Sequence, residues 1–471
     1  MTIRAALALL VALLLFLTAY PLVMLVYGSL HTTPPGEPGA FTLDGYRAML
    51  SRDNARILLN TVGLSLVKTV LAMTLALFLA WIVARTDTPH REALEVLITL
   101  PFYIPPILTA MAWGMLRGVS KRFGDVCAVA DVSLTVADGR LLTLLGPSGC
   151  GKTTTLRMVA GLEPNDTGTI SIGDRVVGDP AAGVWVAPER REIGMVFQSY
   201  AIWPHMTVFA NVAYPLEVRR RPAAEVRARV LDALRSMEMA HLAERPATAL
   251  SGGQQQRVAM ARALVFQPRV LLMDEPLSNL DAKLREQMRV ELRAVQQRLG
   301  ITTLYVTHDQ EEAMVLSDEI AVMHEGRILQ VAAPETLYAR PASRAVAAFV
   351  GSPNLLAAKA RDVRPTAQGT LVRVEADGWE GWCTGPGTLA PGEAVTVVVR
   401  PEAIQLDGRV ERGIAWRGVV RQRFFRGTRN LYAVQVGRDS FSVDAPSDQP
   451  VPPGTEVSLS VDAANTWVVR E

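Results

Sequence analysis

Long apolar runs mark the beginning of the chain. Residues 5–27 and 61–83 form two nearly unbroken runs, and each is long enough in a helix to cross the hydrocarbon core of a bilayer. Both predict membrane spans. A third run, residues 94–116, is interrupted by three prolines, each of which removes a backbone donor that lipid does not replace. We expect this third run to lie at the membrane interface or to pack without crossing.

Each of the two predicted spans has an alternative interpretation. The first run, with Arg4 before it, also resembles a secretory signal peptide, but no small-x-small cleavage pattern follows it cleanly. The second run is compatible with a buried core helix because it contains Lys68, although its length and the flanking Arg85 favour a span. With Arg4 on the inner side, two spans return the chain to the cytosol near Arg85.

From Val119 onward, short β-branched runs alternate with longer helical ones. Residues 130–136 and 141–145 predict strands. Residues 222–239 and 282–299 predict amphipathic helices with a charged outer face. Alternation of this kind predicts a sheet with helices packed on it.

The helical signals fade after Gly351, where short strands separated by Gly, Pro and Asp turns take over. The predicted strands are residues 395–400, 418–425, 432–436 and 457–461. The pattern therefore divides the chain into a membrane segment (1–116), an α/β domain (117–350) and a small all-β domain (351–471).

Composition narrows the classes of function. The net charge of +2 and the absence of a long basic run make nucleic acid an unlikely ligand. The three cysteines, which are far apart, indicate neither a disulfide framework nor a zinc site and fit a reducing cytosol. A length of 471 residues requires more than one folded unit.

A glycine-rich loop links the predicted strand 141–145 to a helical run at residues 154–160. The loop and the first residue of this run are Gly146, Pro147, Ser148, Gly149, Cys150, Gly151, Lys152, Thr153 and Thr154. Glycines in such a phosphate-binding loop let backbone N–H groups point at phosphate oxygens, and the helix adds the positive end of its dipole. Lys152 is predicted to meet the β and γ phosphates, and Thr153 to offer its hydroxyl to Mg²⁺.

Two adjacent acids follow the apolar run 270–273. Asp274 is predicted to hold Mg²⁺, and Glu275 to act as the general base or to orient the attacking water. An exposed strand end is the alternative, but it explains neither the apolar run nor the phosphate loop upstream.

The segment Leu250–Arg257 resembles the signature of ABC ATPases. In that family the signature caps the ATP held by a second subunit, which implies that Ser251, Gly252, Gly253 and Gln254 face the γ phosphate from a helix N-terminus. The resemblance therefore implies two cassettes that close head to tail on ATP and Mg²⁺. It also implies a P-loop NTPase fold with a helical subdomain inserted around residues 200–255.

Further loops resemble this family in the expected order. Gln198 matches the Q-loop glutamine, which contacts Mg²⁺ or water and reports the γ phosphate to the membrane partner. The segment 278–281, which ends at Asp281, matches the D-loop that crosses the dimer interface. His308 matches the switch histidine that holds the γ phosphate, and Phe123 is placed like the aromatic residue that stacks on adenine.

Three segments resemble the ATPases of bacterial importers for iron, polyamines and sugars: residues 309–313, 330–338 and 399–402. The resemblance implies an OB-like C-terminal domain of the TOBE type, and residues 200–205 favour the ferric iron or polyamine branch. Residues 99–106 resemble an importer permease, of which residues 1–116 are a truncated beginning.

The sequence thus predicts an ATPase that energises import of a small solute at the bacterial inner membrane, with its cassette on the cytoplasmic side. The expected partners are a paired cassette, a membrane permease, an external solute-binding protein and membrane lipid. A nonfunctional or regulatory permease–ATPase fusion is the main alternative. An exporter half-transporter is disfavoured because it needs about six spans, and a soluble ABC protein because it has no spans.

Overall fold

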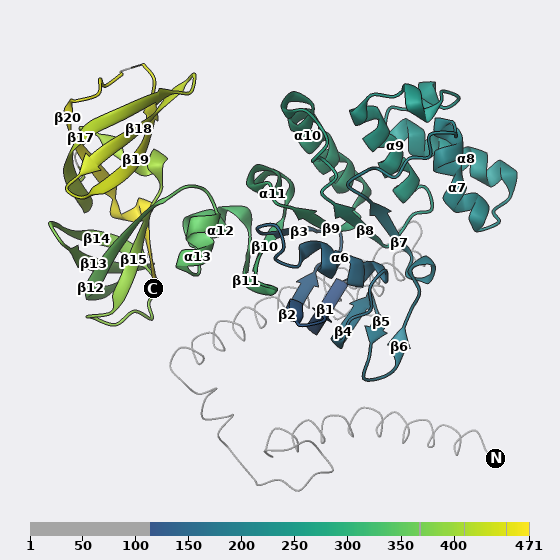
Figure 1. Ribbon diagram of the computed structural model, residues 1–471, viewed down its shortest axis with the longest axis horizontal. Coiled ribbons are helices and arrows are strands. Elements are labelled where there is room, and N and C mark those ends of the chain that lie inside the picture. The colour runs from purple at the N-terminus through teal and green to yellow at the C-terminus, as the bar shows by residue number, and fades with distance from the viewer. Residues whose placement is uncertain (1–113, 367–368, 409, 449, 471) are drawn as a thin grey trace, which may run out of the picture. The chain divides into compact units, whose positions relative to one another are not determined.

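A computed structural model describes residues 114–366, 369–408, 410–448 and 450–470 (Figure 1). The predicted spans 5–27 and 61–83, the permease-like segment 99–106 and almost all of the run 94–116 lie outside these residues. No helix within the described ranges is long and apolar enough to cross a membrane.

The α/β domain begins with an antiparallel sheet of order β2-β1-β4-β5-β6. Its strands are β1 (Gly114–Phe123), β2 (Val126–Val136), β4 (Thr167–Ile172), β5 (Arg175–Asp179) and β6 (Val184–Trp185). Strand β1 starts three residues before the predicted domain boundary at residue 117, because Leu116 is buried and pairs with Leu134 and Ile170. The last residues of the apolar run 94–116 therefore belong to this sheet.

The second sheet has the order β11-β10-β3-β9-β8-β7. It comprises β3 (Leu141–Leu145), β7 (Ile193–Val196), β8 (Val270–Asp274), β9 (Thr302–Thr307), β10 (Glu319–His324) and the antiparallel edge β11 (Arg327–Ala332). The other five strands are parallel, and β3 and β9 are buried along their whole length. Parallel strands end at one edge of a sheet, and that edge is where ligands bind in open α/β folds.

Helices cover this second sheet on both faces. They are α6 (Lys152–Ala160), α7 (Val208–Val218), α8 (Ala223–Ser236), α9 (Gly252–Leu264), α10 (Ala282–Leu299), α11 (Gln310–Leu316), α12 (Pro334–Ala339) and α13 (Arg344–Phe349). Short 3₁₀ turns occur at Pro188–Arg190, Ala240–Leu242 and Ala247–Ala249. Leu156 and Met158 of α6 share a core with residues of both sheets, so α6 lies between them.

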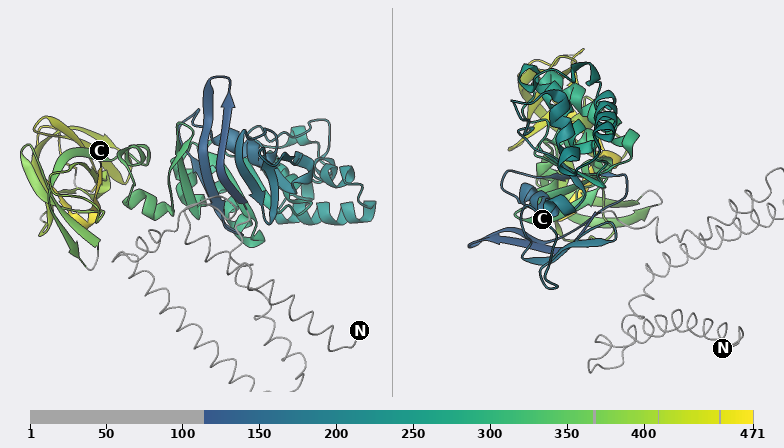
Figure 2. Two further views of the ribbon diagram at one scale, coloured as in Figure 1. Left: turned by 90° about the horizontal axis from the view of Figure 1, so that it is seen from below. Right: turned by 90° about the vertical axis from the view of Figure 1, so that its right-hand side faces the viewer.

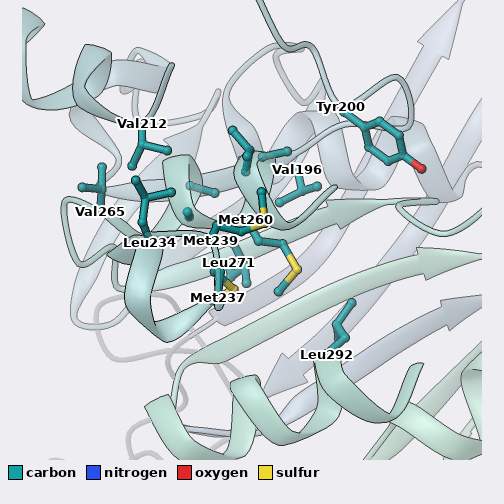
Figure 3. Packing of buried hydrophobic residues seen from close by; sticks show 14 of the residues in the cluster. Val196, Tyr200, Val212, Leu234, Met237, Met239, Met260, Val265, Leu271 and Leu292 are labelled. Carbon is teal, nitrogen blue, oxygen red and sulfur yellow. The ribbon is translucent and has the colours of Figure 1, made fainter. Parts of the chain in front are cut away.

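The predicted helical insertion is formed by α7, α8 and α9. Val212, Leu234 and Met260 from these three helices pack in one core with Leu271 of β8 (Figure 3). The insertion extends to Leu264, beyond the predicted end at residue 255, because α9 continues past the signature and its apolar face joins this core.

The C-terminal domain is all-β, as predicted, with two five-stranded sheets of order β14-β13-β12-β15-β21 and β16-β20-β17-β18-β19. Their bounds are β12 (Asn354–Thr366), β13 (Gly369–Ala376), β14 (Trp379–Gly385), β15 (Ala394–Val399), β16 (Gln405–Leu406), β17 (Gly413–Phe425), β18 (Arg429–Val436), β19 (Asp439–Pro446), β20 (Glu456–Asp462) and β21 (Thr466–Arg470), with 3₁₀ turns at Pro401–Ala403 and Ala463–Asn465. The strands of this domain gather at the C-terminal end of the chain (Figure 2). Both sheets contribute residues to one core, which includes Val397, Tyr432 and Leu459.

Candidate nucleotide site

The phosphate loop occupies residues 146–151, between the end of β3 and the start of α6. Gly151 has a φ of 101°, which favours glycine. A Cβ there would lie 2.2 Å from the Ala128 carbonyl oxygen, and one at Gly146 would lie 2.2 Å from that of Met323. Both glycines are thus required by close backbone approach.

Lys152, the first residue of α6, is buried, with 5% of its surface exposed. Its Nζ donates to the carbonyl oxygens of Gly146 at 2.7 Å and Pro147 at 2.9 Å. The Cys150 Sγ lies 3.7 Å from the same ammonium. These contacts fold the side chain of Lys152 back along the loop, so its charge is held where the sequence predicts phosphate.

Two of the three predicted Mg²⁺ ligands, Thr153 and Asp274, meet at the end of β8, whereas the side chain of the third, Gln198, contacts Glu275. The Thr153 hydroxyl donates to Asp274 Oδ1 at 3.2 Å. Burial, with a smaller contribution from the charge of Glu275, raises the pKa of Asp274, although the Thr153 hydrogen bond opposes this. A hydroxyl and one carboxylate suit Mg²⁺, which keeps water and substrate phosphates as its remaining ligands.

Glu275 follows β8 with a φ of 44°, a left-handed conformation rarely adopted by a non-glycine residue. Its Oε1 lies 2.9 Å from His308 Nδ1, and its Oε2 accepts from Gln198 Nε2 at 3.4 Å. A carboxylate only accepts, so Nδ1 carries the proton in this contact. Three predicted residues from three separate loops therefore converge, at a backbone conformation that is typical of functional sites.

The loop after Glu275 supports this arrangement. Ser278 Oγ donates to the Glu275 carbonyl oxygen at 2.9 Å, and Asn279 Nδ2 donates to that of Gln198 at 2.8 Å. Asp281 is the N-cap of α10 and accepts from the Leu284 amide at 3.0 Å. In this single chain Asp281 thus has a helix-capping contact.

The signature residues form the N-terminus of α9. Ser251 is the N-cap and makes a capping box with Gln254, because each side chain bonds the other's backbone N–H. A Cβ on Gly253 would lie 3.1 Å from Leu284. In the described part of the chain, no hydrogen bond joins Ser251 or Gln254 to the phosphate loop of the same chain.

Phe123 is the last residue of β1 and is 48% exposed. The Lys121 Nζ lies 5.3 Å from the centre of its ring. An exposed ring of this kind is available for stacking on a planar ligand.

A buried cluster behind His308 was missed by sequence reasoning. Glu312 is 2% exposed and accepts from the Tyr305 hydroxyl and the Thr307 hydroxyl, both at 2.8 Å. Burial raises the pKa of Glu312, and burial together with Glu312 raises that of Tyr305 well above its ordinary value. The Thr307 hydroxyl also accepts from the Asp309 amide at 3.0 Å. Hydrogen bonds of this cluster therefore hold the residues on both sides of His308.

Asp309 extends this support to α10. Its side chain caps α11 by accepting from the amides of Glu311 and Glu312 at 2.8 and 3.1 Å. The buried guanidinium of Arg289 lies 3.4 Å from Asp309 Oδ2 and 3.0 Å from Glu311 Oε2. The capping of α11 by Asp309 could have been recognised from sequence, because an Asp at a helix start with Glu in the first turn is a capping pattern. The contact between Arg289 and Asp309 could not, because the two residues are far apart in sequence.

Two regions of the chain match known protein families. The family described as "ABC transporter" matches residues 129–278, and the family described as "TOBE domain" matches residues 397–469. The spermidine/putrescine import ATP-binding protein PotA of Pseudomonas aeruginosa is 48% identical over 336 residues, which cover 70% of this chain and 88% of that relative. The chain belongs to the ATP-binding proteins of ABC importers.

Other relatives in this family carry different solutes in their names. The trehalose/maltose import ATP-binding protein MalK of Thermococcus litoralis is 55% identical over 243 residues, which cover 52% of this chain and 65% of that relative, just under two thirds of its length. The sn-glycerol-3-phosphate import ATP-binding protein UgpC of Rhizobium meliloti is 47% identical over 314 residues, 66% of this chain and 83% of that relative.

The family membership confirms the predicted ABC ATPase with a TOBE domain, and it identifies the chain as a transport ATPase that uses ATP with Mg²⁺. The pairing of Thr153 with Asp274 suits that metal. The named relatives support neither the ferric iron branch nor the permease-like N-terminal segment.

Proposed function

We propose that this importer ATPase energises the uptake of a small solute by hydrolysing ATP at the site around Glu275. The observation that carries the proposal is the convergence of His308 and Gln198 on the Glu275 carboxylate, next to the contact between Thr153 and Asp274. A base held from two sides beside a metal-ligand pair is the arrangement that activation of water for phosphoryl transfer requires.

Each residue has a distinct role in this proposal. Lys152 would exchange the loop carbonyls for the β and γ phosphates. Thr153, Asp274 and Gln198 would hold Mg²⁺, which would supply positive charge at those phosphates. Glu275 accepts the proton of the attacking water. His308 holds the Glu275 carboxylate through Nδ1–H and faces the γ phosphate.

Pairing of two cassettes completes the site. The capping box engages the amides of Ser251 and Gln254. The amides of Gly252 and Gly253, in the first turn of α9, have no acceptor within the helix and are suited to cap the ATP of a second copy. Asp281 and Phe123 would then contribute at the dimer interface and at the adenine. Opening and closing of the pair would drive a permease between its two states, with an external binding protein delivering the solute.

The solute belongs, in this proposal, to the classes that the named relatives carry in their names: sugars, polyamines or glycerol phosphate. The ferric iron suggested by residues 200–205 stays a prediction without support from these relatives. The same holds for the permease-like segment 1–116, and we place the cassette on the cytoplasmic face of the inner membrane.

The test is ATP hydrolysis by the full chain with Mg²⁺. The wild-type chain is expected to hydrolyse ATP, whereas Lys152→Ala loses hydrolysis and most ATP binding. Lys283→Ala, which removes an exposed lysine of α10, serves as the matched control and is expected to match the wild type. Absence of hydrolysis in the wild type, with ATP bound, would contradict the proposal and favour the nonfunctional or regulatory fusion.

A further inference from the structure

The chain makes an unusual turn immediately after Gln198. The Tyr200 amide donates to the Phe197 carbonyl oxygen at 2.9 Å, and Tyr200 and Ala201 have φ values of 60° and 48°. Two successive non-glycine residues in the left-handed region are sterically disfavoured. Contacts from elsewhere in the fold must therefore hold this turn.

Arg262 provides those contacts. Its guanidinium donates to the Tyr200 carbonyl oxygen at 2.7 Å and to that of Ala201 at 2.6 Å. The same guanidinium lies 4.7 Å from the ring centre of Trp203, just beyond the turn. One side chain thus binds both carbonyls of the left-handed pair and the residue that follows it.

The environment of Arg262 shows how specialised this contact is. The side chain is 9% exposed, and burial lowers the pKa of Arg262. No carboxylate lies within ion-pair distance of it in the described ranges. Burial of a cation is costly unless its donors are satisfied, and here the guanidinium donates to the carbonyl oxygens of Tyr200 and Ala201 in the turn after Gln198.

Arg262 lies in the last turn of α9, the helix that begins with the signature. The same end of α9 approaches strand β7 so closely that a Cβ on Gly194 would lie 2.4 Å from the Ala263 carbonyl oxygen. At the other side of the turn, Asn279 binds the Gln198 carbonyl. The Q-loop glutamine is therefore held between the signature helix and the segment that follows Glu275.

We propose that Arg262 is a positioning residue for hydrolysis, which fastens the Q-loop turn to the signature helix so that α9 and Gln198 move together. The inference rests on the proposed roles of Gln198 and Glu275. When a second cassette engages α9, Arg262 transmits that engagement to Gln198 and so to the Glu275 carboxylate.

The first test is Arg262→Lys in the full chain. Lysine keeps the charge but lacks the planar fork that binds two carbonyls at once. The turn should relax and misplace Gln198, lowering kcat for ATP about tenfold or more, with the KM for ATP within about twofold of wild type because the phosphate loop is untouched.

Arg219→Lys is the matched control. Arg219, at the end of α7, also donates to a carbonyl, that of Pro215 at 2.9 Å, and also stacks on an aromatic ring, that of Phe266 at 4.1 Å. Both contacts lie away from the turn after Gln198, so this variant should keep the wild-type kcat.

A rescue separates positioning from general structure. Glycine adopts positive φ without a Cβ penalty, so Ala201→Gly should restore at least half of the activity that Arg262→Lys loses. The control for this rescue is Arg220→Gly in the same Arg262→Lys background. Arg220 has a similar φ of 55° but lies in a different turn, so this substitution should restore no activity.

A substitution in the turn itself, Ala201→Val, tests the same role even if Arg262→Lys does not fold. Ala201 is exposed, so Ala201→Val meets little steric hindrance but places a β-branched residue at positive φ. It should reproduce the loss of kcat at unchanged KM. Wild-type activity in Ala201→Val, or equal kcat values for Arg262→Lys and Arg219→Lys, would overturn the inference. Failure of the wild-type chain to hydrolyse ATP would instead overturn the proposed function.

Discussion

Two glutamates that follow the neighbouring strands β8 and β9 differ in exposure and in hydrogen-bond partners. Glu275, after β8, has 20% of its side chain exposed and is bonded by Gln198 and His308, two side chains from other loops. Glu312, in α11 after β9, is buried and bonded by two hydroxyls of β9 itself. A general base must be accessible to the attacking water, whereas a buried carboxylate with its hydrogen bonds satisfied suits a structural role. The difference predicts which glutamate carries activity and which carries stability.

Glu275→Gln should show the largest effect. The amide keeps the shape of the side chain but accepts no proton from water, so hydrolysis should fall by about 10²–10⁴ while ATP binding is retained. Turnover and nucleotide affinity of the full chain measure the two quantities separately. Substantial residual turnover would show that Glu275 is not the base.

Glu312→Ala should instead lower the free energy of unfolding, on the order of 3 kcal/mol, because it leaves two buried hydroxyls without their acceptor. Chemical denaturation of the full chain gives this value. The control is Glu311→Ala, which removes an exposed partner of Arg289 and should cost under about 1 kcal/mol. Equal costs for the two variants would remove the distinction between a buried and an exposed carboxylate.

Tyr305→Phe tests the same cluster more gently. Loss of one buried hydroxyl donor to Glu312 should cost about 1 kcal/mol of unfolding free energy. Tyr214→Phe is the matched control because Tyr214 is 43% exposed, and its unfolding free energy should stay within about 0.5 kcal/mol of wild type. The reverse order of these two costs would count against the cluster.

The smallest expected effect is a pH dependence. The pKa of Glu312 is raised above its ordinary value of 4.5 in the folded chain, so the folded state binds its proton more tightly than the unfolded state. This contribution to stability is fully present below the ordinary value and is lost as pH rises through the raised one. Denaturation at several pH values should therefore show wild type gaining stability relative to Glu312→Gln on acidification from neutral pH, and a constant difference would contradict this.

Much of the fold followed from local pattern. Strand β3 and helix α10 have the predicted bounds, residues 141–145 and 282–299, because an apolar run and a strong 3.6-residue period leave little ambiguity. Of the C-terminal strands, β15, β17, β18 and β20 overlap predicted segments, whereas β12, β13, β14, β16, β19 and β21 were not predicted. In β12, charged residues such as Lys359 and Arg361 alternate with buried small ones, so the strand has too little apolar character to be recognised alone.

Sequence motifs predicted the residues of the candidate site, but not the residues that hold its loops in place. Glu275, His308 and Gln198 were predicted as functional residues, and the structure brings their side chains into contact. Arg289 and Arg262 were missed because each acts on a loop distant in sequence and belongs to an ordinary helix pattern. Contacts of that kind depend on tertiary packing, which no local spacing encodes.

The most direct test of the account is a double-mutant cycle of His308→Ala and Glu275→Gln, read out as ATP hydrolysis by the full chain. If His308 acts by holding the Glu275 carboxylate, the double variant should hydrolyse ATP no more slowly than Glu275→Gln alone, because the residues act as a unit. Losses that multiply, so that the double variant is slower by the full product of the single effects, would show that the two side chains act independently and would contradict the account.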